Sequence, residues 1–181
     1  MKKIFIILLI ISLIGLTGCG IINPSELVLP DDIEFIELVE KLDTPLKTVI
    51  YLSENITPKA NKYTSVTPYE LYINKFGDCN DFATFGMFCA NYHGYNTYEI
   101  IIYFLNSSLK HAIAVYEEYG GYTFSDINYY RDDPFNSFLD IVNADIEHLN
   151  SFFIDENHYK WNSYKVYDYN MNIIEEGFNA P

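Results

Sequence analysis

KFGDCNDFATF, residues 75–85, places a cysteine directly after a Gly-Asp pair and directly before a run of residues that is typical of a buried helix. The break at Gly77 and the apolar run that follows predict a helix from about Cys79 to about Tyr92, where a His-Gly pair supplies a stop. Small residues recur along it at helical spacing, at Ala83, Gly86 and Ala90. This helix can therefore pack closely against a flat surface, with its cysteine in the first turn.

The position of Cys79 favours the thiolate form of its side chain. Backbone N–H groups in the first turn of a helix are unpaired, and the helix dipole is positive there. Asp78 and Asp81 lie close in sequence and oppose a further negative charge. The site therefore needs a local cation, and a histidine paired with the cysteine is the usual source.

Of the four histidines, His111 is the best candidate for that partner. His93 is at the far end of the same helix, about 20 Å from Cys79 at 1.5 Å per residue. His148 is expected at the end of another helix, and His158 lies in an acidic loop. His111 opens a predicted strand, on the face that it shares with Ile113 and Val115.

Asp126 closes the next predicted strand and is the candidate third member. Residues 111 and 126 have their midpoint between Glu118 and Tyr119. A turn centred there would place the two residues opposite each other, and a turn centred one residue later would leave them diagonal, about 7–8 Å apart. A tight turn at residues 120–121 would shift the register further and weaken the pairing. In the first two registers Asp126 can accept from the far ring nitrogen of His111 and orient the ring.

The order of predicted elements indicates an α+β fold. Helices are expected first, in 31–42, from Thr44 onward, in 67–77 and after Gly77, followed by a central strand at 97–105, a hairpin over 111–126, a helix at 134–149 and a last hairpin over 159–178.

Together these motifs resemble the transglutaminase-like superfamily of cysteine enzymes. The residues that carry the resemblance are Gly77-Asp78-Cys79-Asn80-Asp81-Phe82-Ala83, His111-Ala112, Phe124-Ser125-Asp126 and the Thr67-Pro68-x-Glu70 lead-in, which span about residues 63–130. The resemblance implies a papain-like core, in which a Cys-bearing helix packs on an antiparallel sheet that supplies His and Asp. Many relatives carry a Trp or Gln before the Thr-Pro step that helps to hold the oxyanion. Here Asn61 and Tyr63 are the candidates for that second donor.

The N-terminus is predicted to be a lipoprotein signal. Residues 1–18 combine two lysines with an apolar run of about fifteen residues, shorter than the about 20 that span a membrane. Leu16-Thr17-Gly18-Cys19 resembles the bacterial lipobox, which implies cleavage before Cys19 and its lipidation by fatty acyl chains such as palmitate. A plain signal peptide or an uncleaved anchor is the alternative. Residues 19–30 then form a tether and residues 31–181 a single domain.

Charge and composition restrict the partners. The signal removes two of 11 basic residues, so nine remain beside 25 acidic ones, for a net charge of −16. Such a surface repels nucleic acid and anionic lipid headgroups, so membrane attachment depends on the acyl chains. Cys79 and Cys89, ten residues apart on one helix, are about 15 Å apart, too far for a disulfide. No metal motif and no cofactor motif is present, and we expect a monomer.

The sequence thus predicts a lipid-anchored, extracytoplasmic thiol enzyme in the cell envelope of a bacterium. Cys79, His111 and Asp126 would act on peptide or carboxamide bonds through a thioester, resolved by water in a peptidase or amidase, or by an amine in a transglutaminase. The alternative is a catalytically idle surface binding module on the same fold, which predicts that Cys79→Ala leaves the cellular phenotype intact. A cell-wall-cleaving peptidase of papain-like type fits less well, since those enzymes resemble DCSG where this chain has DCND.

Overall fold

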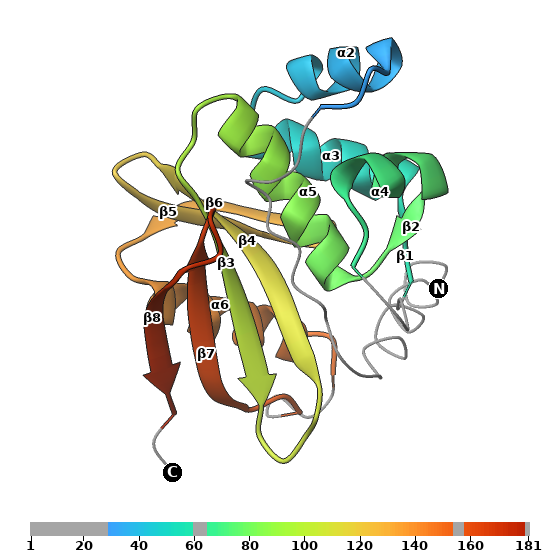
Figure 1. The fold of residues 1–181 in the computed structure, drawn as a ribbon. Coiled ribbons are helices and arrows are strands. Elements are labelled where there is room, and N and C mark those ends of the chain that lie inside the picture. The colour runs from blue at the N-terminus through green and yellow to red at the C-terminus, as the bar shows by residue number, and fades with distance from the viewer. Residues whose placement is uncertain (1–28, 60–64, 154–157, 180–181) are drawn as a thin grey trace.

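The structure, a computed structural model, describes residues 29–59, 65–153 and 158–179 (Figure 1). The helices are α2 (Ile33–Lys41), α3 (Pro45–Asn55), α4 (Pro68–Asn74), α5 (Cys79–Tyr92) and α6 (Phe138–Asn150). The strands are β1 (Thr57–Pro58), β2 (Phe76–Gly77), β3 (Thr97–Phe104), β4 (Lys110–Glu118), β5 (Gly121–Asp126), β6 (Tyr129–Phe135), β7 (Trp161–Asp168) and β8 (Ile173–Phe178). No helix in these three ranges combines the length and the apolar character needed to cross a membrane.

One antiparallel sheet organises the molecule. Its strand order is β6-β5-β4-β3-β7-β8, so β3, the predicted central strand, lies between β4 and β7. The short strands β1 and β2 form a separate parallel pair beside the N-terminal end of α5 (Figure 1). The predicted fold class is confirmed: an α+β arrangement in which the Cys-bearing helix packs on an antiparallel sheet.

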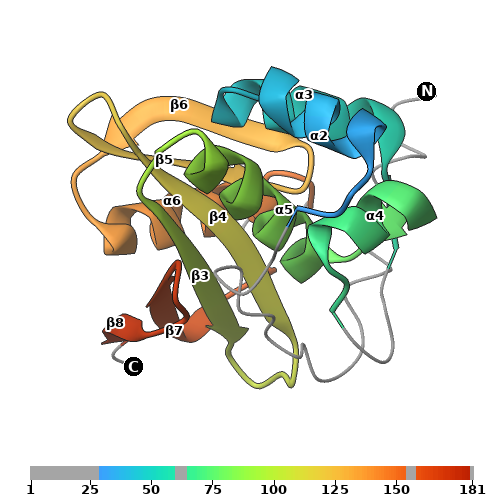
Figure 2. The same ribbon diagram turned by 45° about the horizontal axis from the view of Figure 1, so that its top comes forward.

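The sheet is covered on both faces. Helix α5 packs on one face, where small side chains of the helix and of β4 allow a close approach, and α6 covers the other (Figure 2). A third apolar cluster joins α2, α3 and α4 to the outer side of α5. Because α5 is enclosed from both sides, eleven of its residues are buried, from Asn80 to Ala90.

The helix starts follow from local capping chemistry. Asp32 accepts from the Phe35 N–H at 3.1 Å, and Thr44 accepts from the Lys47 N–H at 3.3 Å, with Pro45 in the first helical position. The Thr-Pro-x-Glu spacing of residues 67–70 predicts a capping box, and Thr67 and Glu70 form it at the start of α4.

Three local predictions were wrong. Helix α4 ends at Asn74 rather than at Gly77, because Lys75 adopts a left-handed conformation with φ of 60°. The segment at 129–135, with two aspartates and a proline, forms strand β6, which tolerates them because it lies at the sheet edge; α6 therefore begins only at Phe138. In α3 the spacing of Leu46, Val49 and Ile50 predicts an apolar stripe, but the buried face contains Val49 and Leu52, whereas Leu46 and Ile50 are exposed.

The β4–β5 hairpin turns at Tyr119 and Gly120, which have φ of 55° and 78°. Positive φ at both central residues is what a two-residue type I′ turn requires. Ala114 pairs with Ser125, so Asp126 is two residues out of register with His111. This is the diagonal arrangement, one of the two that the sequence left open.

Replacing Tyr119 with asparagine is expected to stabilise the protein by about 1 kcal/mol, because asparagine tolerates a positive φ better than an aromatic residue does. Tyr119 is 77% exposed, so little packing is lost. The midpoint of urea unfolding should rise with an unchanged slope, and Tyr119→Ala should give no such gain because alanine is strained there too. A midpoint that falls in Tyr119→Asn would contradict this account of the turn.

Candidate active site

Cys79 is the first residue of α5, and two aspartates hold this end of the helix. Asp78 is the N-cap and accepts from the N–H of Asn80 at 3.1 Å, while Asp81 accepts from the N–H of Asp78 at 2.9 Å. The sequence predicts an electrostatic effect of Asp78 and Asp81 but not this capping box. Cys79 is half-buried and free, and it packs against the apolar cluster between α5 and the sheet.

Asp81, the second aspartate of this capping box, opposes a thiolate on Cys79 less strongly than its position in the sequence indicates. Asp81 is buried and also accepts from the Val66 N–H at 2.8 Å. Burial and the neighbouring Asp78 raise the pKa of Asp81. Its neutral form is therefore favoured more than in an exposed aspartate.

The other cysteine of α5 has a different environment. Cys89 is fully buried and free, and burial raises the pKa of its thiol. It packs with the aromatic side chains that join α5 to the outer helices, as expected of a small core residue.

His111 and Asp126 are brought together by the hairpin. The His111 Nε2 atom lies 3.0 Å from Oδ1 of Asp126, and the two side chains are 1% and 6% exposed. Strand β5 ends at Asp126, so the first residues of β4, with His111 among them, extend past the end of β5. The predicted approach of the aspartate to one ring nitrogen is therefore found.

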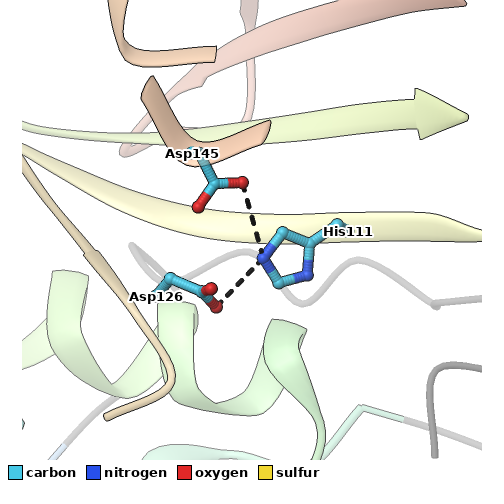
Figure 3. Close-up of side chains that lie close together, drawn as sticks. All are labelled: His111, Asp126 and Asp145. Atoms are coloured by element: carbon cyan, nitrogen blue, oxygen red, sulfur yellow. Dashed lines mark ion pairs between the residues drawn. The ribbon is translucent and has the colours of Figure 1, made fainter. Parts of the chain in front are cut away.

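A second carboxylate, Asp145 of α6, approaches the same nitrogen. Its Oδ2 atom lies 3.7 Å from His111 Nε2, and Asp145 is fully buried. Figure 3 shows the two carboxylates reaching Nε2 from different directions. Asp126 is close enough for a hydrogen bond but poorly aligned with Nε2, and Asp145 lies beyond hydrogen-bond distance, so Nε2 has no hydrogen bond of good geometry within the described residues.

The ring of His111 also meets the side chain of Cys79. Burial opposes a charge on this ring, but Asp126, Asp145 and the Cys79 side chain together raise the pKa of His111 well above its ordinary value. Because Nε2 faces the two carboxylates, Nδ1 is the nitrogen left for the sulfur. This contact is not an aligned hydrogen bond either. Such contacts are often loose in ligand-free enzymes and tighten when substrate binds.

The three charged side chains of this cluster are also of the kind that binds metal ions. His111, Asp126 and Asp145 each offer one ligand atom, and these atoms lie within 4.8 Å of one another. A nitrogen with two carboxylate oxygens suits zinc or another transition metal better than calcium or magnesium.

The remaining histidines have structural contacts. His93 is the C-cap of α5, as predicted, and its Nε2 lies 2.8 Å from the Val39 carbonyl oxygen. His148 stacks on Tyr129 with ring centroids 3.7 Å apart, and His158 stacks on Phe153 at 3.9 Å.

Three residues singled out in the sequence lie outside the described residues: the lipidation candidate Cys19 and the oxyanion candidates Asn61 and Tyr63. Asp145, in contrast, was missed. It lies inside a predicted amphipathic helix, where an aspartate gives no local signal of its function. Its position among the buried residues Ile141, Val142, Ile146 and Leu149 is the one clue that the helical periodicity offers.

Comparison with known proteins adds little to this geometry. No protein-family model matches the chain, and no curated protein is significantly similar to it. Among solved structures, LapG of Legionella pneumophila is similar with a TM-score of 0.45 and 13% identity, over 78% of this chain and 76% of LapG. A likeness of that size carries no information about activity or substrate.

Proposed function

We propose that this chain is a thiol enzyme of the transglutaminase-like superfamily, with Cys79 as nucleophile, His111 as acid and base, and Asp126 as the group that orients His111. The observation that carries the proposal is the meeting of these residues. A half-buried cysteine at a helix start touches a buried imidazole, and that imidazole lies 3.0 Å from a carboxylate. The resemblance of the GDCND, HA and FSD motifs to the superfamily supports the same assignment.

In the first step, the Cys79 sulfur attacks the carbonyl carbon of a peptide or carboxamide bond as a thiolate. The new oxyanion is held by the backbone N–H of Cys79, which is free of intrahelical partners at this end of α5. His111, protonated on the nitrogen that faces the sulfur, gives that proton to the departing amine. The C–N bond breaks and a thioester remains on Cys79.

In the second step, His111 removes a proton from the incoming nucleophile, which attacks the thioester and releases the thiol. Water gives a carboxylic acid, as in a peptidase or amidase, and an amine gives a new amide, as in a transglutaminase. We favour hydrolysis of a peptide or protein substrate. Throughout, Asp126 stabilises the charged ring and limits its rotation.

The proposal includes the cellular location. The lipobox motif ending at Cys19 would anchor a monomeric domain by acyl chains on the outer side of a bacterial membrane. The tether of residues 19–30 would hold the domain away from the lipid surface, which suits the strongly acidic composition of the chain.

The test is the rate at which iodoacetamide alkylates Cys79, followed by mass spectrometry between pH 5 and pH 9. At pH 6, His111→Ala should react at least about tenfold more slowly than wild type, because the imidazolium that stabilises the thiolate is gone. His158→Ala, which removes an exposed histidine, is the matched control and should react like wild type. Cys89 is buried and serves as an internal reference for unfolding.

Equal Cys79 rates in wild type and His111→Ala over the whole pH range would reject the enzymatic proposal. The idle binding module would then be the better account of the same fold.

A further inference from the structure

The buried aspartate of α6 has no structural partner that explains it. Asp145 is fully buried, and neither of its carboxylate oxygens has a hydrogen bond within the described residues. Buried carboxylates are almost always paired, because leaving one unpaired costs more than leaving out a neutral group. The nearest ion-pair partner of Asp145 is the Nε2 atom of His111, 3.7 Å away.

Two carboxylates approach the Nε2 atom of His111. Asp126 approaches Nε2 to 3.0 Å from β5, and Asp145 approaches it to 3.7 Å from α6 on another side (Figure 3). A single N–H bond cannot point at both oxygens, and here it forms an aligned hydrogen bond with neither. The ring is therefore held between two acceptors rather than by one directed bond.

We propose that Asp145 is a positioning residue that, together with Asp126, holds the His111 ring between two carboxylates. The proposal deepens the proposed function and rests on it as far as Cys79 is concerned. Its claim about the His111 ring stands on the geometry alone.

The groups whose charges act on His111 come from four parts of the chain. They are Cys79 of α5, Asp126 of β5, Asp145 and His148 of α6, and Tyr159, which precedes β7. Burial lowers the pKa of His148 and raises that of Tyr159, so both favour their neutral forms near pH 7. The carboxylates are then the groups that determine the charge of the ring.

The charge of Asp145 itself depends on pH. Burial and the neighbouring Asp126 raise the pKa of Asp145, while His111 opposes this rise. Asp145 therefore gains its negative charge at a higher pH than an exposed aspartate does. Once Asp145 is ionised, its negative charge favours the protonated form of the His111 ring.

The test is an NMR titration of the His111 ring in wild type and in Asp145→Asn, which keeps the shape of the side chain and removes its charge. The signal is assigned by its absence in His111→Gln. The midpoint of the His111 titration should fall by about one pH unit or more in Asp145→Asn, because a charge less than 4 Å from the ring is lost. Glu147→Gln changes an exposed carboxylate of the same helix and should leave the midpoint unchanged.

The same variants separate this proposal from the proposed function. If the His111 midpoint falls in Asp145→Asn and the pH profile of Cys79 alkylation shifts to lower pH with it, both proposals are supported. If the His111 midpoint falls while Cys79 alkylation is unaffected, Asp145 acts on the ring as proposed and the thiol enzyme is rejected.

An unchanged His111 midpoint in folded Asp145→Asn would overturn the proposal. Should Asp145→Asn fail to fold, as judged by circular dichroism, Asp145→Ser is titrated in its place by the same criterion. A titration with zinc chloride tests whether His111, Asp126 and Asp145 bind a metal ion instead. Binding of one Zn²⁺ by wild type that is lost in the Asp145 variant would mark a metal site and would also overturn the proposal.

Discussion

Glu99→Gln is expected to remove the contribution of one buried carboxyl group to a pH-dependent loss of stability that we expect of wild type between pH 4.5 and pH 8. Glu99 lies in the middle of β3, paired with Ala114 on one side and Tyr167 on the other, and is 2% exposed. Its Oε1 atom has no hydrogen-bond partner within the described residues. Burial, assisted by the charge of Asp78, raises the pKa of Glu99 to about 8.

The direction follows from the order of the two pKa values. The unfolded chain releases the Glu99 proton near the ordinary value of 4.5, whereas the folded chain keeps it until about 8. Glu99 therefore makes its full contribution to the stability of the folded state below pH 4.5, and this contribution is lost as the pH rises to 8. At 1.36 kcal/mol per pKa unit the loss is on the order of 5 kcal/mol, a large part of the stability of an ordinary domain.

The measurement is the free energy of unfolding in urea at pH 5 and at pH 8.5. Asp81 and Asp145 also have raised pKa values and add to the loss in wild type, but they are unchanged in Glu99→Gln. The difference between the two proteins therefore isolates Glu99. The unpaired amide lowers stability by a similar amount at both pH values and leaves this difference intact.

Glu54→Gln, at an exposed position of α3, is the matched control and should follow wild type. The prediction would be contradicted if wild type and Glu99→Gln lost the same free energy of unfolding between the two pH values. That result would show that Glu99 ionises in the folded state at little cost.

The parts of this fold that follow from local chemistry could be predicted from the sequence. The span of α5, the cap of α3 and the hairpin of β4 and β5 depend on residues within a few positions of one another. The His111–Asp126 contact could also be predicted, as one of two registers, because the hairpin that joins them is short. Only the turn residues decide between those registers, and Tyr119 gives no turn signal, since its positive φ is unusual for an aromatic residue.

What could not be predicted depends on contacts between distant segments. Asp145 meets His111 only because α6 crosses the sheet face opposite α5, and nothing in its own helix fixes that position. Glu99 interrupts an apolar run, and its burial follows from the sheet order, which places β7 beside β3. Strand β6 exists because β5 offers an unpaired edge, although its own residues favour a loop. In each case packing overrides the local preference.

The Cys-bearing helix lies close to the sheet at one glycine, and this contact gives the second large prediction. A Cβ atom at Gly86 of α5 would lie 2.4 Å from the hydroxyl oxygen of Tyr116 in β4. Tyr116 is fully buried, and its hydroxyl is 2.8 Å from the Ser125 hydroxyl, so it cannot move without losing that hydrogen bond. The short distance between α5 and β4 explains why small residues line this face of α5.

Gly86→Ala is therefore expected to lower the free energy of unfolding by about 2–4 kcal/mol. Overpacking costs about 1–3 kcal/mol and an unpaired buried hydroxyl about 1–3 kcal/mol, while alanine returns about 1 kcal/mol in helix propensity. Urea unfolding of Gly86→Ala, Tyr116→Phe and the double variant measures the coupling. Removing the hydroxyl leaves the nearest ring carbon 3.6 Å from the new Cβ, an ordinary contact, so Tyr116→Phe should rescue most of the loss. Additive losses in the double variant would show that α5 shifts as a whole, in which case Gly86→Ala should also alter the alkylation of Cys79 by moving the sulfur away from His111.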